Sequence, residues 1–191
     1  MSGTITEVGQ RSRIVDAALS LMSQRGAAGT SMRQLATACG LNVATIYHYF
    51  PSKADLLRAV IEERRYGERI ATEDPPIDSN LPPRQRLEAL LIWVWDQTQT
   101  EHTVLRLVLG EGVRGDVTAQ QSARDLIAAL ERGMVSWMER GFPELADRGV
   151  DPAGAGRLIR RHLLALEAEH LATGHADGAS AATELAAILF D

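Results

Sequence analysis

The sequence predicts an all-α protein of about nine helices, in which a short helix-turn-helix domain precedes a larger helical domain. Apolar residues recur every three to four positions along most of the chain, which is typical of amphipathic helices. Residues 31–53, SMRQLATACGLNVATIYHYFPSK, predict two short helices around a tight turn and the start of a third. Residues 74–83, DPPIDSNLPP, hold four prolines. Because proline interrupts helices, this segment predicts a break between two domains.

We therefore expect a disordered, polar N-terminus at 1–11 and a helix-turn-helix domain at 12–58, whose last helix continues to about 73. Residues 74–191 form the second predicted domain. The first helix is predicted at 12–25, with Gly26 as its C-terminal cap residue.

Capping residues define the two short helices. Ser31 and Gln34 have the spacing of a capping box, and Gly40 allows the sharp exit that the turn requires. Asn42 can cap a second helix at 43–49, because its side chain can accept an orphan amide. After Pro51, the pair Ser52 and Asp55 repeats the capping-box spacing for the third helix.

The second short helix divides into two faces at about 100° per residue. The inward face is predicted to hold Ile46, Tyr49 and Phe50, and the outward face Ala44, Thr45, Tyr47 and His48. Small and polar outward side chains suit close approach to phosphates and base edges. The alternative is an ordinary polar surface helix, since helix-turn-helix geometry also occurs in proteins that do not bind DNA.

Charge separates the two ends of the chain. The net charge is −5, yet residues 1–53 carry five Lys or Arg and two acidic residues, so they are net positive. A basic end on an acidic protein favours contact with a phosphate backbone through that end. Lys53 is the single lysine of the chain.

Composition sets the cellular context that we expect. The hydrophobic fraction of 45% with 24% charged residues is ordinary for a globular protein. We find neither an apolar run of eighteen residues nor an apolar stretch at the start, so we expect a cytoplasmic protein without a membrane partner. The lone Cys39 excludes an intramolecular disulfide and suits a small packed thiol, with a redox sensor as the alternative.

The second domain is predicted to contain five further helices. Their expected ranges are 84–101, 103–109, 117–140, 152–173 and 179–190. Gly110 is expected to end the second of these, and 141–149 is expected to form a turn.

Residues 14–60 resemble the N-terminal domain of the TetR (tetracycline-repressor) family of transcriptional regulators. The resemblance lies in G-T-S-x-R-x-L-A, then C-G-L, then T-I-Y-H-Y-F-P-S-K-x-x-L. The rest of the chain resembles the family only in length and helical texture. The resemblance implies a cytoplasmic homodimer that binds a palindromic double-stranded DNA operator and responds to a small-molecule effector.

The resemblance also implies roles for residues of the helix-turn-helix. Phosphate contacts are expected from Ser31, Tyr47, His48 and Lys53, and base contacts from Arg33, Val43, Ala44 and Thr45. Val43 and Ala44 offer no side-chain hydrogen bonds, so their readout would be contact with thymine methyl groups or DNA shape.

Two further surfaces are expected in the second domain. The last two helices are apolar on more than one face, which suits a four-helix dimer contact; burial within one chain is the alternative. The predicted interface residues are Leu158, Ile159, His162, Leu163, Leu166, His170, Leu185, Ile188 and Leu189. The predicted effector pocket contains Trp93, Trp95, Gln97, His102, Met134, Trp137 and Met138, with a dry core as the alternative.

No motif in the sequence predicts an enzyme. There is neither an HExxH pair nor a phosphate-binding G-x-x-x-x-G-K, and Glu167, Glu169 and His170 suit a solvated or interface patch better than a metal site. We expect no cofactor and no metal. The sequence therefore predicts a ligand-responsive transcriptional regulator, most simply a repressor. The alternative is a helical ligand-binding or protein-interaction module without sequence-specific DNA binding.

Overall fold

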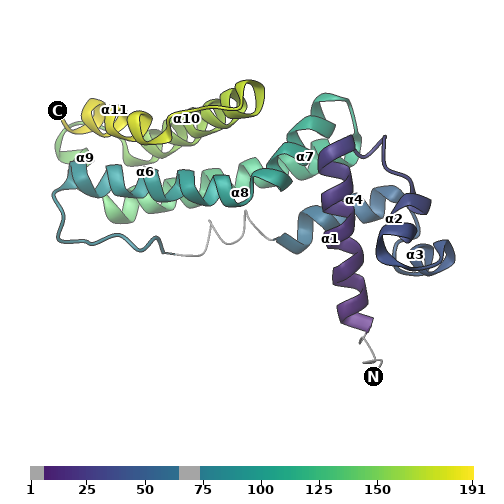
Figure 1. Ribbon diagram of the computed structural model, residues 1–191. Helices are drawn as coiled ribbons and strands as arrows, with labels where there is room; N and C mark the ends of the chain where they lie inside the picture. Colours follow the sequence, from purple (N-terminus) through teal and green to yellow (C-terminus); the bar gives the residue numbers. More distant parts are fainter. Residues whose placement is uncertain (1–6, 65–73) are drawn as a thin grey trace. The chain divides into compact units, whose positions relative to one another are not determined.

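The computed structural model describes residues 7–64 and 74–191, which form ten helices and no strand. Figure 1 shows their order along the chain. The helices are α1 (Glu7–Arg25), α2 (Met32–Cys39), α3 (Val43–Tyr49), α4 (Lys53–Arg64), α6 (Pro83–Thr100), α7 (His102–Val113), α8 (Val117–Gly141), α9 (Glu144–Asp147), α10 (Pro152–Thr173) and α11 (Gly178–Phe190). The all-α prediction is confirmed.

The helices divide into two compact units. The first comprises residues 1–65 and 102–124, and the second comprises 66–101 and 125–191. The sequence analysis assigned all residues from 74 onward to the second domain, so α7 and the start of α8 are the difference. Val104, Leu107 and Val108 of α7 are buried in the same apolar core as α1–α4. Helical periodicity identifies an apolar face but not the partner that covers it, which is why the sequence did not show this grouping.

In the first unit, α1 packs against α2, α4 and α7, and α2 packs against α3. Ile14, Leu35, Ile46 and Leu56 have no accessible surface and form the centre of this core. The two short helices are therefore held from their inner sides. Their outer sides remain available to a partner.

In the second unit, α11 packs along α6. The backbones of α8 and α10 come close at Gly156, where a Cβ atom would lie 2.9 Å from the Cα atom of Val135. At Gly178, a Cβ atom would overlap the indole of Trp95. These two glycines permit a packing distance between helices that a larger side chain would prevent.

Several helix ends differ from the predicted ones. Helix α1 begins at Glu7, so 7–11 are helical rather than disordered; 1–6 lie outside the described residues. Helix α4 is described to Arg64, and its predicted continuation to about 73 also lies outside them. Residues 74–82 contain no helix, as predicted.

Helix α7 is longer than predicted, because it continues through Gly110 to Val113. Gly110 keeps an ordinary negative φ, and the chain turns instead at Gly115, where φ is +89°. The predicted turn at 141–149 contains the four-residue helix α9, which accounts for the tenth helix. Within the described part of the chain, no helix combines the length and apolar character that crossing a membrane requires.

Candidate nucleic-acid interface

Helix α2 begins with the predicted capping box. Ser31 Oγ accepts a hydrogen bond of 3.2 Å from the backbone amide of Gln34, whose Oε1 accepts one of 2.8 Å from the amide of Ser31. At the other end Gly40 adopts φ +65°, and its amide bonds back into the last turn. The chain leaves α2 in the left-handed conformation at Gly40 and starts α3 three residues later, at Val43.

Helix α3 presents a polar outer face. Asn42 Oδ1 accepts hydrogen bonds from the Thr45 amide at 2.7 Å and from the Thr45 hydroxyl at 2.9 Å. Tyr47 is 49% exposed, and Ala44 and His48 are also exposed. This outer face agrees with the sequence analysis for three of its four residues. Thr45 is half-buried, because its hydroxyl completes the cap.

The inner face of α3 anchors the helix. Ile46 and Phe50 are buried, and the half-buried Val43 and Tyr49 pack against the same core. The Tyr49 hydroxyl donates to Gln10 Oε1 at 3.2 Å. Val43, which was predicted to face base edges, therefore has only part of its side chain available to DNA.

Lys53 lies beside the start of α2. Its Nζ donates to the carbonyl oxygen of Thr30 at 3.4 Å, one residue before Ser31. Ser52 Oγ accepts from the Asp55 amide at 3.1 Å and so caps the helix that begins at Lys53. The structure therefore brings Ser31 and Lys53, two of the predicted phosphate ligands, to one place. Arg33, on the first turn of α2, is exposed.

Two arginines of α1 add positive charge near these helices. The Arg11 guanidinium lies over the ring of Phe50, 5.2 Å from its centre.

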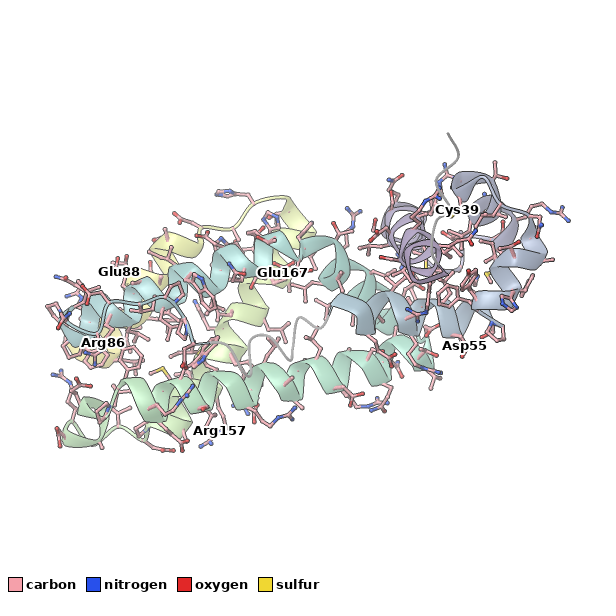
Figure 2. All side chains as sticks on the ribbon, turned by 90° about the horizontal axis from the view of Figure 1, so that it is seen from below. Cys39, Asp55, Arg86, Glu88, Arg157 and Glu167 are labelled. Atoms are coloured by element: carbon pink, nitrogen blue, oxygen red, sulfur yellow. The ribbon has the colours of Figure 1, made fainter. Side chains whose placement is uncertain are left out.

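Burial raises the pKa of the Cys39 thiol, and the nearby Arg13 guanidinium opposes part of that rise. Cys39 and Asp55 are labelled in Figure 2. The thiol is half-buried at the end of α2, in agreement with a packed side chain.

The helix-turn-helix unit matches a known family. Residues 14–60 match the bacterial regulatory proteins of the tetR family. The N-terminal domain belongs to this family. This confirms the prediction that was made from the G-T-S, C-G-L and T-I-Y-H-Y-F motifs.

Individual relatives extend the comparison beyond residues 14–60. The chain is 31% identical over 96 residues to the probable HTH-type transcriptional regulator YttP of Bacillus subtilis, covering 50% of this chain and 45% of that protein. It is 28% identical over 109 residues to the HTH-type transcriptional repressor KstR2 of Rhodococcus jostii, covering 54% and 50%. The matched region thus spans about half the length of these relatives.

Solved structures extend the comparison to the second unit. The transcriptional regulator FadR of Bacillus subtilis, in complex with stearoyl-CoA, is similar with a TM-score of 0.68 at 15% identity, over 93% of this chain and 96% of that one. At this identity the similarity concerns the fold. The similarity of fold to this regulator therefore extends over both units of the chain.

A hollow of about 550 Å³ lies within the second unit. Leu90, Trp137 and Phe142 contribute apolar surface, and Arg86, Arg140 and Glu144 contribute charge. Arg86 Nη2 lies 2.8 Å from Glu144 Oε1, and this hydrogen bond lowers the pKa of the Glu144 carboxyl. Figure 2 shows Arg86 and Glu88 towards the beginning of α6. This mixture of apolar walls and a few polar groups is typical of small-molecule sites.

The hollow contains one of the predicted effector residues, Trp137. Trp93 packs edge-to-face on Trp137, with ring centres 5.7 Å apart, but is not part of the lining. Met134 and Met138 are buried, and neither is part of the lining of this hollow. The other predicted residues lie elsewhere: Trp95 against His170 and Gly178, half-buried Gln97 further along α6, and His102 in the first unit.

Sequence reasoning missed most of this lining. The residues that it missed are Asp74, Pro75, Ile77, Ser79, Arg86, Leu90, Arg140, Gly141, Phe142, Pro143 and Glu144. They come from the loop before α6 and from the ends of α6, α8 and α9, which meet only in the folded chain. The proline-rich loop was the one available signal for this lining. Its prolines indicated a non-helical segment, and four residues of that segment line the hollow.

The predicted dimer residues divide by exposure. Leu158 is 51% exposed and Ile188 75% exposed, and His162 and Leu163 are half-buried. Ile159 has no accessible surface, so it packs inside its own chain and is removed from the predicted interface. The same interior position limits Leu166, Leu185 and Leu189, which are all less than one-tenth exposed. His170 is half-buried and packs edge-to-face against Trp95.

Proposed function

We propose that the chain is a cytoplasmic, homodimeric transcriptional repressor that binds a palindromic DNA operator and is released by a small-molecule effector. The observation that carries the proposal is the capped helix α3, which is anchored by Ile46 and exposes Tyr47 and His48 on its outer face. An exposed second helix after a tight turn is the part of a helix-turn-helix that enters the major groove. The role is regulatory rather than catalytic.

The phosphate contacts are assigned to Tyr47, His48, Lys53 and Ser31. Lys53 and Ser31 lie together at the start of α2, so they are suited to bind neighbouring phosphates of one DNA strand. Base contacts are assigned to Ala44, Thr45, Arg33 and the accessible part of Val43. Phosphate contacts fix the position of the helix, and base contacts select the sequence.

The effector is proposed to bind in the hollow of the second unit. Trp137, Leu90 and Phe142 would contact an apolar body, and Arg140 would orient a polar group. FadR, which has a similar fold, was solved in complex with stearoyl-CoA, and this supports the proposal of a ligand site in the second unit. The term repressor rests on the resemblance to KstR2.

Dimerisation is proposed through α10 and α11. Leu158 on α10 and Ile188 on α11 are large apolar side chains. About half of the surface of Leu158 and three-quarters of that of Ile188 are exposed. Exposed apolar surface of this kind is typical of interaction sites. A two-fold dimer would present two copies of α3 to half-sites about one DNA turn, or 34–36 Å, apart.

The experiment that tests the DNA assignment compares two cations of α4. We expect Lys53→Ala to weaken binding to a selected operator duplex, measured by fluorescence anisotropy. The slope of log affinity against log salt concentration should become smaller in magnitude by about one. Arg58→Ala is the matched control, because Arg58 is an exposed cation of the same helix whose guanidinium pairs with Asp55 at 3.4 Å. Equal affinity of the two variants and the wild type would refute the phosphate role of Lys53.

A further inference from the structure

A buried carboxylate of α7 reaches the corner between α1 and α2. Glu111 is 3% exposed, and its Oε1 accepts a 3.0 Å hydrogen bond from the backbone amide of Ala27. The same oxygen lies 2.6 Å from Nη1 of Arg114. All three residues belong to the first unit. This hydrogen bond ties the backbone of the α1–α2 connection to the side chain of α7.

The neighbouring residue is shaped to admit this carboxylate. Gly26 adopts φ +75°, and a Cβ atom at this position would lie 2.9 Å from Glu111 Oε1. Glycine therefore serves two purposes here: it permits the left-handed turn at the end of α1 and leaves space for the side chain of α7. The corner and the carboxylate fit each other.

The same corner leads directly to the proposed phosphate ligands. Thr30 Oγ1 donates to the carbonyl oxygen of Gly26 at 3.0 Å, and the Thr30 amide donates to the carbonyl oxygen of Ala27 at 3.2 Å. The Thr30 carbonyl in turn accepts from Lys53 Nζ. The next residue, Ser31, caps α2. Residues 26–31, which we name the α1–α2 corner, thus connect Glu111 to Ser31 and Lys53 through successive hydrogen bonds.

We propose that Glu111 is a positioning residue for DNA binding. It holds the α1–α2 corner through the Ala27 amide, and the corner holds Ser31 and Lys53 in the geometry that grips phosphate. The inference rests on the proposed DNA-binding function. It gives α7, a helix outside the helix-turn-helix, a direct role in operator affinity. What the corner needs is an acceptor at the correct reach, which Oε1 at the end of the Glu111 side chain provides.

Two conservative variants separate reach from charge. Glu111→Gln keeps the length and the acceptor but loses the charge, and Glu111→Asp keeps the charge but shortens the reach by one methylene. The probe is a duplex that the wild-type chain enriches from a random-sequence pool, and binding is measured by anisotropy over a series of salt concentrations. Arg114→Ala is the control, because it removes the ion pair and leaves the acceptor in place.

We expect Glu111→Gln and Arg114→Ala to bind within about threefold of the wild type. We expect Glu111→Asp to bind about tenfold more weakly, which is 1.4 kcal/mol. The slope of its log affinity against log salt concentration should also be smaller in magnitude by about one, because a phosphate contact is lost. A purely structural role would reduce the folded fraction without changing the slope of the folded protein. Hydrogen exchange of the Ala27 amide should be faster in the Asp variant than in the Gln variant.

The proposal is overturned if Glu111→Asp binds with wild-type affinity and slope, or if Glu111→Gln loses as much affinity as Glu111→Asp. A wild-type chain that enriches no sequence would instead overturn the proposed function. In that case the exchange experiment still decides on the hydrogen bond, since equal exchange of the Ala27 amide in both variants would overturn the positioning role.

Discussion

The helix-turn-helix holds its two short helices with local caps, and the second unit adds ion pairs between segments that are far apart in sequence. In the helix-turn-helix, Ser31 and Asn42 bond to backbone amides three residues further along the chain. In the second unit, Asp177 caps α11 in the same local way, but Arg86 also bonds to Glu144 and Arg84 to Asp191, so polar groups join segments that are far apart in sequence. Local bonds complete each short helix and leave its outer face available. Long-range bonds join distant segments of the second unit, so these polar groups stabilise its tertiary structure.

This difference explains why the helix-turn-helix suits recognition and the second unit suits packing. An interface for DNA needs polar groups that are held in position but still accessible, as Tyr47 and His48 are. A helical body needs close backbone contact, as at Gly156, and buried apolar side chains such as Met138. Substitutions in the two regions should therefore have different consequences.

The largest effect is expected at the proposed dimer surface. Ile188→Arg places a charge in an apolar contact, and the two-fold symmetry of a dimer would place it there twice. We expect the dimer dissociation constant to rise at least about 100-fold, measured by analytical ultracentrifugation. Val113→Arg is the control, because Val113 is 90% exposed but lies on α7. An unchanged dimer in the Ile188 variant would exclude this surface from the interface.

The second effect tests close packing in the second unit. Gly156→Ala forces a Cβ atom against the backbone of Val135, and we expect it to lower the free energy of unfolding by about 1–3 kcal/mol. Gly112→Ala is the matched helical control, since its Cβ atom would meet Gln120 only at 3.9 Å. That control should be neutral or stabilising by up to about 1 kcal/mol. Urea unfolding measures both, and equal effects would contradict the packing argument.

The third effect tests the local bonds of the helix-turn-helix. Asn42→Ala removes the cap of α3, and we expect a loss of about 1 kcal/mol in stability. Hydrogen exchange of the Thr45 amide should become faster, because its acceptor is gone. Asn80→Ala is the control, since Asn80 bonds to Asp78 in the loop before α6 and caps no helix. Unchanged exchange at Thr45 would show that the cap does not hold α3.

The smallest effect is a pH dependence in the second unit. The hydrogen bond from Arg86 holds the pKa of Glu144 below its ordinary value of 4.5. A lowered folded-state pKa stabilises the fold above the unfolded pKa, and this stability is lost as the pH falls through the folded pKa. Glu144 is partly exposed, so the effect should be under about 1 kcal/mol. Arg86→Met should abolish this component of acid sensitivity in urea unfolding; an unchanged pH profile would contradict it.

Sequence reasoning succeeded where the chemistry is local. The caps at Ser31 and Asn42 and the turn at Gly40 depend on neighbours within a few residues, so the positions of α2 and α3 could be predicted. The family motifs lie in the same stretch. The exposure of the Tyr47 and His48 side chains could be predicted from the helical repeat alone.

Sequence reasoning failed where two distant segments meet. Nothing in the helical repeat of α7 indicates that Glu111 reaches Ala27, or that the helix belongs to the first unit. Likewise, the aromatic side chains of α6 and α8 were all equally suitable for a cavity, yet Trp137 lines the hollow and Trp93 only supports it. Apolar character predicts burial and leaves the partner open.

The central claim is that this chain recognises a DNA sequence through α3. Selection from a random-sequence duplex pool by the wild-type chain, followed by sequencing, tests it most directly. We predict enrichment of a palindrome whose half-sites are about one DNA turn apart, and loss of that enrichment when Tyr47 and His48 are both changed to Ala. Recovery of no preferred sequence at moderate salt would contradict the claim and favour a helical ligand-binding module without sequence-specific DNA binding.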